Sequence, residues 1–322
     1  MENNVKEFAA LQLQPMPELG HKTCLLEVDC NGQKVTDWAY EHKGKIEKML
    51  EQQGMLLIRG LNIMSSKQFG QILTTLFGQE LANYDYRSTP RTELKGNIYT
   101  ATEYPPSEVI QQHNESAYSN RWASKLGFLC MLPAASGGAT PIADSRIVYQ
   151  RIPKEIREKF EKKKLKYVRN YGSIDLPWTE VFQTTDRDVV ESYCKENMLD
   201  FEWKENDGLR TSQTNEASQI HPRTGESVWF NQAHMFHISA LDLQVRNSML
   251  SVYAEHDLPR NVYYGDGSAI EEEALDLIRD IYEQEKAWFT WQAKDLMLLD
   301  NMLFTHGRMP FTGDRKVLVG MA

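Results

Sequence analysis

Three short runs of strand-forming residues in the C-terminal part of the chain decide its fold class: Trp288–Gln292 (WFTWQ), Leu296–Leu299 (LMLL) and Val317–Val319 (VLV). Glycine, proline and aspartate residues separate the runs, as expected of turns. Short strands with few helices between them are typical of an antiparallel sandwich or barrel. The sequence therefore predicts a mainly β protein with helical insertions.

The N-terminal quarter, residues 1–84, predicts a mixed α/β portion that packs on this β core. Apolar residues at helical spacing predict a helix over residues 42–53, which Gly54 ends. Residues 55–58 (MLLI) are typical of a buried strand. A second helix is expected to be capped by Ser66. The apolar face of that helix carries Phe69, Ile72, Leu73 and Leu76.

Helical insertions are predicted in the middle of the chain. Pro153 stands where a helix can begin, and Ser268 with Glu271 fits a capping box at the start of another. The apolar face of this second helix carries Ile270, Ala274, Leu277, Ile278 and Ile281. Since the chain has no repeat and no linker-like stretch, one domain spanning residues 1–322 is expected.

Composition limits the classes of partner. The 322 residues carry a formal net charge of −9, which disfavours nucleic acid because nonspecific binding needs clustered Lys and Arg. No 18-residue apolar window and no signal-like apolar start occur, so neither a membrane partner nor secretion is expected. The cysteines form no CxxC pair, which is typical of reduced thiols in a cytoplasmic protein. They are Cys24, Cys30, Cys130 and Cys194.

His113 and Glu115 are candidate metal ligands, because side chains at i and i+2 of a strand share one face. His306 is the best third ligand, since it follows a strand-like run and precedes a turn-like segment at residues 307–311. Two histidines and one carboxylate form the facial triad of non-haem iron oxygenases, which leaves positions open for cosubstrate and oxygen. The spacing alone is weak evidence, because an HxE triplet occurs by chance in many proteins.

Arg315, nine residues after His306, strengthens the metal hypothesis. A guanidinium can grip a carboxylate in bidentate fashion. The diacid 2-oxoglutarate can chelate a metal through its keto-acid end while its distal carboxylate meets such an arginine. The residues therefore favour an iron(II) site that takes 2-oxoglutarate.

Further segments follow in order along the chain. They are Thr100–Pro105 with His113–Glu115, Gly137–Asp144, His221–Glu226, Trp229–Gln232, and Asp300–Asn301 with His306–Arg308 and Arg315. Together they resemble the taurine dioxygenase/clavaminate synthase-like family over roughly residues 85 to 322. The glutamate at position 115, where aspartate is more usual, is similar to the syringomycin-biosynthesis-like subgroup.

The resemblance implies a double-stranded β-helix, that is, a jelly-roll core, and an Fe(II)- and 2-oxoglutarate-dependent dioxygenase that consumes O2. It implies iron ligation by His113, Glu115 and His306, and binding of the distal carboxylate of 2-oxoglutarate by Thr140 and Arg315. Related halogenases lack the carboxylate ligand, so Glu115 indicates hydroxylation, desaturation or ring formation. The expected substrate is an amino acid or a derivative of one in natural-product biosynthesis, free or tethered to a carrier protein.

Residues that could contact this substrate are spread over several segments. Each has an alternative structural role: Asn231 and Gln232 could instead satisfy buried backbone groups, and Arg308 could form a salt bridge within its turn. His234 and His237 could hold a metal at i, i+3 spacing, but no carboxylate lies near them in sequence. The substrate candidates are Glu103, Asn114, Asn231, Gln232, His237 and Arg308.

Two other functions remain open at this level. Two histidines and a glutamate are also a ligand set of zinc hydrolases, which need no grip for a diacid. A jelly roll can also be a binding module without catalysis. Thr140 and Arg315 argue against both, because they complete a cosubstrate site.

Overall fold

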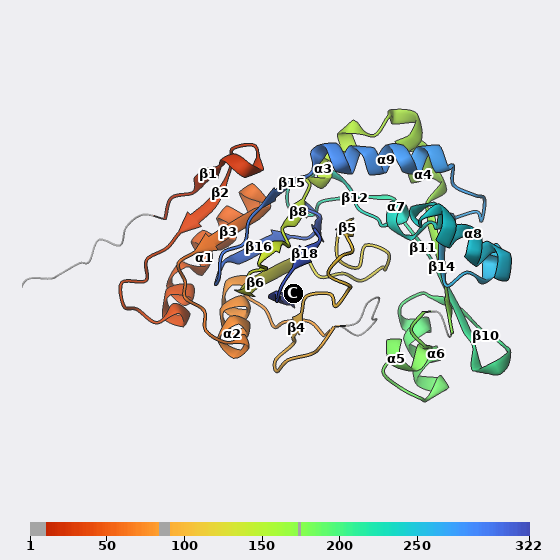
Figure 1. Cartoon of the computed structure of the whole chain (residues 1–322), viewed down its shortest axis with the longest axis horizontal. Helices are drawn as coiled ribbons and strands as arrows, with labels where there is room; N and C mark the ends of the chain where they lie inside the picture. Colours follow the sequence, from red (N-terminus) through yellow and green to blue (C-terminus); the bar gives the residue numbers. More distant parts are fainter. Residues whose placement is uncertain (1–10, 84–90, 173–174) are drawn as a thin grey trace, which may run out of the picture.

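The computed structural model of the chain describes residues 11–83, 91–172 and 175–322. Its centre is a seven-stranded sheet with the strand order β1-β2-β3-β16-β6-β19-β4 (Figure 1). The strands are β1 (Gln14–Met16), β2 (Lys22–Glu27), β3 (Met55–Arg59), β4 (Ile98–Thr100), β6 (Lys125–Leu132), β16 (Leu296–Asp300) and β19 (Lys316–Met321). Strand β16 pairs antiparallel with both β3 and β6, and β2 runs parallel to β3. The predicted strands at 55–58, 296–299 and 317–319 therefore lie in one sheet, the first two side by side and the third separated from them by β6.

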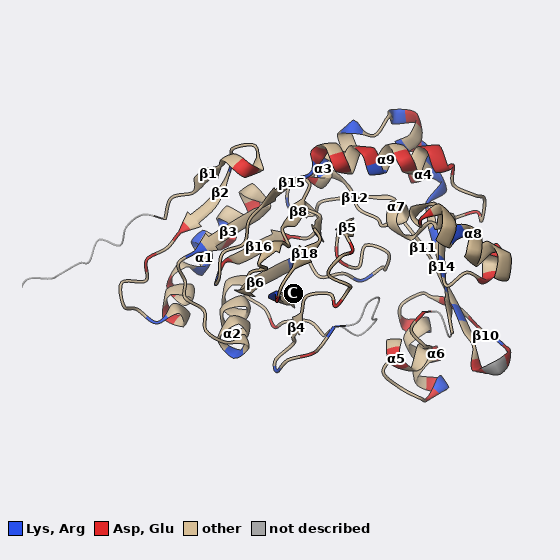
Figure 2. Cartoon of the chain, viewed as in Figure 1, with Lys and Arg blue, Asp and Glu red and all other residues tan. Residues whose placement is uncertain are grey.

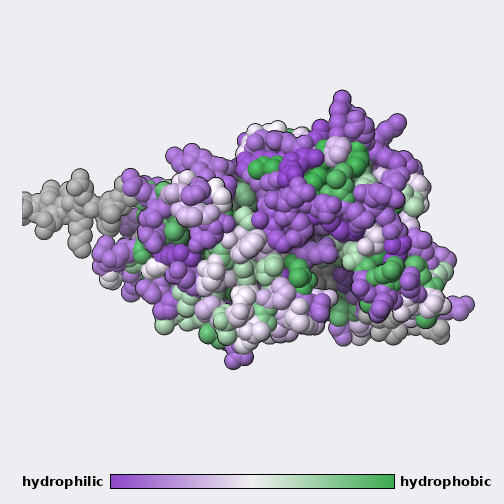
Figure 3. All heavy atoms as spheres, turned by 45° about the horizontal axis from the view of Figure 1, so that its top comes forward, coloured by the Kyte–Doolittle hydropathy of each residue, from purple (hydrophilic) through white to green (hydrophobic). Residues whose placement is uncertain are grey.

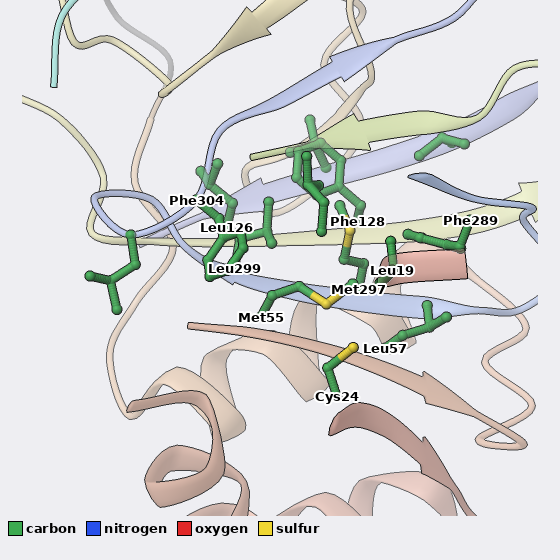
Figure 4. Packing of buried hydrophobic residues seen from close by; sticks show 14 of the residues in the cluster. Leu19, Cys24, Met55, Leu57, Leu126, Phe128, Phe289, Met297, Leu299 and Phe304 are labelled. Carbon is green, nitrogen blue, oxygen red and sulfur yellow. The ribbon is translucent and has the colours of Figure 1, made fainter. Parts of the chain in front are cut away.

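Strand β16 is apolar throughout because both of its faces are covered. Met297 and Leu299 belong to one buried cluster, and Leu296 and Leu298 belong to another on the opposite face. Figure 4 shows the first cluster, in which Met297 packs near Phe128 of β6. A strand buried on both faces shows a continuous apolar run in place of alternation.

Short strand pairs carry four of the predicted site residues, His113, Thr140, His306 and Arg308. The pairs are β5 (Ile110–His113) with β17 (His306–Arg308), β7 (Ser136–Gly137) with β18 (Phe311–Thr312), β8 (Thr140–Ile142) with β15 (Ala287–Phe289), and β12 (Ser218–Ile220) with β13 (Ser227–Trp229). Ile142 and Phe289 share the first apolar cluster with the central sheet. The β8–β15 pair therefore packs on one face of that sheet as a second layer.

Helices α1 (Val35–Gln53) and α2 (Ser66–Phe77) cover the other face of the sheet. Gly54 ends α1 with φ +72°, as predicted, but α1 begins earlier than residue 42 because Val35 and Trp38 extend its buried face. The predicted cap of α2 is wrong by one residue. Ser65 caps the helix by accepting from the backbone N–H of Gln68 at 3.2 Å.

An insertion between β8 and β15 in sequence forms a four-stranded sheet with the order β10-β11-β9-β14. Its strands are β9 (Leu165–Tyr171), β10 (Asp200–Trp203), β11 (Leu209–Asn215) and β14 (Arg260–Tyr264), and its helices are α5 (Trp178–Val181), α6 (Arg187–Glu196) and α8 (Leu243–Val252). We call these elements the insertion sheet and its helices. Helical insertions were predicted in this region and are present, but the strands of the insertion sheet were not predicted; β9 and β11 alternate buried and half-buried residues in runs rich in polar side chains.

The remaining helices are α3 (Ser145–Arg151), α4 (Lys154–Lys163), α7 (Ala233–Phe236) and α9 (Glu272–Glu285), with 3-10 turns at Pro17–Leu19, Glu205–Asp207, Ile238–Ala240 and Glu255–Asp257. Pro153 precedes α4, as predicted. The capping box of α9 was wrong, because Glu271 is itself the cap position and the Ser268 hydroxyl donates to Asp266. Acidic residues, most of them exposed, occur along α9 (Figure 2); Ala274, Ile278 and Ile281 of its predicted apolar face are buried, and Leu277 is half-buried.

Two further observations concern membrane-spanning helices and the state of the cysteines. In the described part of the chain, no helix has the length and apolar character needed to cross a membrane. The four cysteines are free thiols, and those of Cys24, Cys130 and Cys194 are buried.

Candidate metal centre and cosubstrate pocket

The structure brings the three predicted ligands together. His113 ends β5 and lies directly opposite His306, the first residue of β17, and their ring centroids are 4.6 Å apart. The Oε2 atom of Glu115 lies 3.6 Å from Nε2 of His306 and 4.0 Å from Nε2 of His113. All three side chains are buried, and one donor atom from each lies within 4.8 Å of the other two.

The position of Glu115 has a different origin from the one predicted. Strand β5 stops at His113, so the strand alternation does not extend to Glu115, which lies in a turn. The next residue, Ser116, has φ +57°, a left-handed conformation that turns the backbone sharply. The turn therefore sends the Glu115 side chain to the same point as the two imidazoles.

The imidazole of His113 is prepared to donate a lone pair. Its Nδ1 lies 2.8 Å from the carbonyl oxygen of Gln111, which accepts a hydrogen from it and leaves Nε2 unprotonated toward the centre. Burial, reinforced by the nearby His306, lowers the pKa of His113 to about 4. A neutral imidazole is the form that binds a metal.

Arg91 contacts the carboxylate of Glu115 and was missed from the sequence. Its Nη2 donates to Oε2 of Glu115 at 2.9 Å, and both side chains are buried. Burial alone would raise the pKa of Glu115, but the charge of Arg91 and the nearby imidazoles of His306 and His113 outweigh it and hold that pKa well below its usual range. The glutamate is therefore an anion at neutral pH, as a metal ligand must be. No spacing rule connects Arg91 to the triad, so the sequence carried no signal for it.

A small pocket opens beside the two histidines. Thr140, Arg308 and Arg315 contribute its polar wall, and Phe128 contributes to its apolar wall. Trp291 Nε1 donates to the Thr140 hydroxyl at 3.0 Å, which leaves the hydroxyl hydrogen to be donated elsewhere. Burial, with the nearby Arg308, lowers the pKa of Arg315 to about 10, so its guanidinium is still a cation at neutral pH. The pocket thus joins the two histidines of the triad to cationic and hydroxyl groups that can bind an anion.

The Gly137-Gly138 pair is explained by this pocket. Gly138 has φ +69°, its carbonyl oxygen accepts from Arg315 Nε at 3.2 Å, and a Cβ atom on it would lie 3.1 Å from the Arg315 side chain. A side chain here would be strained and would press on the guanidinium. Gly138 therefore allows Arg315 to lie along the loop.

Arg308 lines the same pocket but has a structural task. Its guanidinium donates to the carbonyl oxygens of Tyr104, Pro105 and Glu108 at 2.8, 2.6 and 2.9 Å. The alternative of a salt bridge within its turn was therefore wrong. Arg308 therefore ties β17 to residues 104–108.

The other substrate candidates lie outside this pocket lining. The Glu103 side chain is exposed and accepts hydrogen bonds from Thr92 and Thr100 at 2.6 and 2.8 Å. Gln232 Nε2 donates to the Asn114 carbonyl at 2.6 Å, and Asn231 Nδ2 donates to the Ala217 carbonyl at 2.6 Å. For Asn231 and Gln232 these contacts favour the alternative in which they satisfy buried backbone groups.

The two remaining histidine candidates are engaged separately. His234 Nε2 lies 2.9 Å from the Gln112 carbonyl, and His237 Nδ1 lies 2.8 Å from the Ser239 hydroxyl. Burial lowers the pKa of each to about 4. Among residues 11–83, 91–172 and 175–322, the only cluster of metal-type donors is His113, Glu115 and His306.

Comparison with known sequences gives one family and two clear relatives. Residues 12–322 match the family described as "Taurine catabolism dioxygenase TauD, TfdA family". The chain is 40% identical over 277 residues to "Dapdiamide synthesis protein DdaC" of Enterobacter agglomerans, covering 86% of this chain and 84% of the relative. It is 30% identical over 298 residues to "Clavaminate synthase-like protein At3g21360" of Arabidopsis thaliana, with 87% and 84% covered.

Solved structures share the fold at low sequence identity. PvcB of Pseudomonas aeruginosa, described as an Fe, alpha-ketoglutarate dependent oxygenase from an isonitrile synthetic pathway, has a TM-score of 0.57 at 14% identity, covering 100% of this chain and 94% of its own. A taurine dioxygenase of Burkholderia xenovorans has a TM-score of 0.56 at 12% identity, with 97% and 89% covered. The likeness therefore extends over nearly the whole chain.

Proposed function

We propose that this chain, which belongs to the taurine catabolism dioxygenase TauD, TfdA family, hydroxylates an unactivated C–H bond of an amino acid or amino-acid-derived substrate. Family membership confirms the predicted dioxygenase, and with the buried cluster of two histidines and a glutamate it confirms iron(II) and 2-oxoglutarate as its cofactors. The syringomycin-biosynthesis-like subgroup remains a prediction. The observation that carries the proposal is that this cluster opens onto a pocket lined by Thr140 and Arg315.

In this proposal His113, Glu115 and His306 hold the iron, and O2 is the co-reactant. Two neutral imidazoles and one carboxylate leave the complex with iron(II) at a net charge of about +1, which suits an anionic cosubstrate. Arg315 and the Thr140 hydroxyl bind the distal carboxylate of 2-oxoglutarate. Iron with 2-oxoglutarate and O2 supplies the oxidising power that breaks an unactivated C–H bond.

The protein's own contribution is to bind, orient and exclude water. The Arg315 guanidinium is largely desolvated, so its attraction to a carboxylate is stronger than in water. Phe128 packs on His306 with ring centroids 5.0 Å apart and keeps that side of the centre apolar. Arg91 holds Glu115 ionised and in place. Because the carboxylate ligand is present, hydroxylation, desaturation and ring closure are favoured over halogenation, and desaturation or cyclisation is the alternative within this chemistry.

A zinc hydrolase is the alternative from another class. The ligand set would suit zinc, but a hydrolase has no use for a buried arginine and threonine beside the metal. The same pocket argues against a binding module without catalysis. The iron-dependent reaction therefore has the stronger support.

The substrate class is inferred from the relative named for dapdiamide synthesis, which fits natural-product biosynthesis. Whether the substrate is free or tethered to a carrier protein is part of what must be tested. We further propose a double-stranded β-helix core within a single domain, supported by the strand pairs β5–β17, β7–β18 and β8–β15 beside the central sheet. A cytoplasmic location is supported by the free thiols.

The test is the visible charge-transfer band that iron(II) and 2-oxoglutarate give together without oxygen. We expect the wild-type band to be lost in His306→Ala and retained in the matched control His256→Ala, whose side chain is 71% exposed. No band in the wild type, or an unchanged band in His306→Ala, would contradict the assignment. A panel of free and carrier-bound amino acids, with succinate as the readout, then identifies the substrate.

A further inference from the structure

Asn301 carries a buried side-chain amide that connects the segment of His113 and Glu115 to the segment that leads to His306. It follows directly after β16, five residues before His306, and has no exposed surface. Its Oδ1 accepts from the backbone N–H of Glu115 at 2.7 Å, and its Nδ2 donates to the backbone carbonyl of Glu115 at 2.9 Å. One side chain therefore holds both polar groups of the Glu115 backbone.

Glu115 needs such a partner because it lies beyond the end of β5. Within a strand, the N–H and C=O of a residue are fixed by the neighbouring strand. Here the ladder between β5 and β17 stops at His113, and the backbone turns sharply at Ser116. The amide of Asn301 takes the place of a neighbouring strand, and by fixing the Glu115 backbone it fixes the direction in which the carboxylate leaves it.

Asn301 is itself held firmly from the segments around it. Its Nδ2 also donates to the Ala123 carbonyl at 2.8 Å, its backbone N–H donates to the Ser124 carbonyl at 2.9 Å, and its carbonyl accepts from Asn114 Nδ2 at 2.6 Å. The hydrogen bond from Asn114 links Asn301 to the segment that carries both ligands, since Asn114 lies between His113 and Glu115. A displacement of Asn301 would thus move the glutamate and the start of the His306 segment together.

We infer that Asn301 is a positioning residue for iron binding: its amide sets the Glu115 carboxylate against His306, and both its acceptor and its donor are required. This inference rests on the proposed function, because it assigns Asn301 a role in a centre formed by His113, Glu115 and His306. The inference adds to the proposed metal centre a residue that would contact neither the metal nor the substrate.

The competing explanation is that Asn301 only satisfies buried backbone groups, as Asn231 does. Asn231 is equally buried, donates to the Ala217 carbonyl at 2.6 Å and accepts from the Ala233 N–H at 3.0 Å. Its backbone partners belong to residues that carry no metal-type donor. Asn231→Asp is therefore the matched control for Asn301→Asp, since both changes keep the acceptor and remove the amide donors.

The experiment measures iron(II) affinity by anaerobic titration of the full chain, beside the apo protein's free energy of unfolding in urea. In Asn301→Asp we expect iron affinity to fall about 10- to 100-fold, the range seen when partners that orient metal ligands are changed. The charge-transfer band with 2-oxoglutarate should shift or weaken at saturating iron. Asn231→Asp should lose unfolding free energy while its iron affinity stays within about 2-fold of wild type.

Further outcomes decide the inference. Iron affinity within 2-fold of wild type in a folded Asn301→Asp, or equal losses in both variants, would overturn it. Asn301→Ser, which removes both arms of the amide, should lose at least as much affinity. If neither Asn301 variant folds while Asn231→Asp does, Asn301 serves the fold as a whole, and the positioning role is rejected. A wild type without a charge-transfer band would instead reject the proposed function itself.

Discussion

The metal centre and the insertion sheet are held together by different interactions. At the centre, polar side chains are buried and mostly fixed by short hydrogen bonds to backbone groups, as with His113 and Arg308. In the insertion, Arg169 and Arg260 both grip Asp175, and helix α8 buries none of its residues. Hydrogen bonds to the backbone fix the positions of metal ligands closely, whereas the buried ion pairs of the insertion stabilise the fold away from the metal and its exposed helix tolerates change. Mutations at the metal centre should therefore change the binding of iron or 2-oxoglutarate. Mutations in the insertion should change the free energy of unfolding or have no measurable effect.

The largest effect expected is on the ion-pair cluster of the insertion. Asp175 is 10% exposed, and its carboxylate accepts from Arg169 at 2.9 Å and from Arg260 at 2.8 Å. Asp175→Ala leaves both guanidinium groups without that carboxylate, which should cost about 3 kcal/mol in unfolding free energy. Urea unfolding measures this loss, and iron affinity should be unchanged. A large loss of iron affinity would show that the two regions are coupled and would break the comparison.

The next effect belongs to the cosubstrate pocket. Arg315→Leu removes the cation proposed to bind the distal carboxylate while keeping an apolar side chain of moderate size. We expect the KM for 2-oxoglutarate to rise about 100-fold, which corresponds to about 2.7 kcal/mol of lost binding free energy.

Iron affinity without 2-oxoglutarate provides the control for Arg315→Leu. It should change little, because Arg315 donates to the Gly138 carbonyl and contacts no proposed ligand. A parallel loss of iron and 2-oxoglutarate binding would mean that the pocket collapses, and the assignment of Arg315 to the distal carboxylate would fail.

Burial of His234 makes apo stability depend on pH. The folded pKa of His234 is lowered to about 4 by burial, below the value of about 6.5 expected when unfolded. The folded state therefore binds fewer protons, so the stabilisation is present above pH 6.5 and is lost as pH falls toward 4. His234→Gln should reduce the fall in unfolding free energy between pH 7 and pH 5 by roughly 2 kcal/mol.

Urea unfolding of both apo proteins at the two pH values measures the effect of His234→Gln. Buried His113 and His237 also have pKa values near 4 and contribute to the slope of both proteins, so only the difference between them reports on His234. Equal slopes would show that His234 is not kept neutral by the fold.

The sequence predicted the parts of this molecule that follow local patterns. Buried strands such as Leu296–Asp300 can be recognised by their continuous apolar runs. The amphipathic helix α9 can be recognised by the helical spacing of its apolar residues. The three triad residues and Arg315 were predicted from residue type, spacing and family resemblance. The structure then brought the triad together and placed Arg315 in the adjoining pocket.

Contacts between distant segments were not predictable in this way. Arg91 reaches Glu115 across 24 positions, and Asn301 reaches it across 186, so no periodicity links them. The strands of the insertion sheet were missed because their polar residues hide the alternation; Arg169 and Arg210 both stand within them. Local sequence patterns determine which segments form helices and strands, whereas these long-range contacts depend on how the whole chain packs.

The smallest effect should come from the exposed side of the insertion. On α8, Leu243 is 66% exposed and Val252 is 72% exposed, and Figure 3 shows green apolar patches among purple ones at the end of the molecule where the insertion lies. Leu243→Ala removes little buried surface and slightly favours the helix, so its unfolding free energy should stay within about 0.5 kcal/mol of wild type.

The matched control is Leu299→Ala, because Leu299 lies fully buried on β16 and the chemical change is identical. It should cost about 2 to 5 kcal/mol, since it leaves a cavity between the packed layers. A loss of more than 1 kcal/mol in Leu243→Ala would mean that α8 is covered in solution, for instance by a second copy of the chain. Sedimentation of the wild type beside Leu243→Ala would then separate an interface from an intramolecular contact, because only an interface changes mass when the leucine is removed.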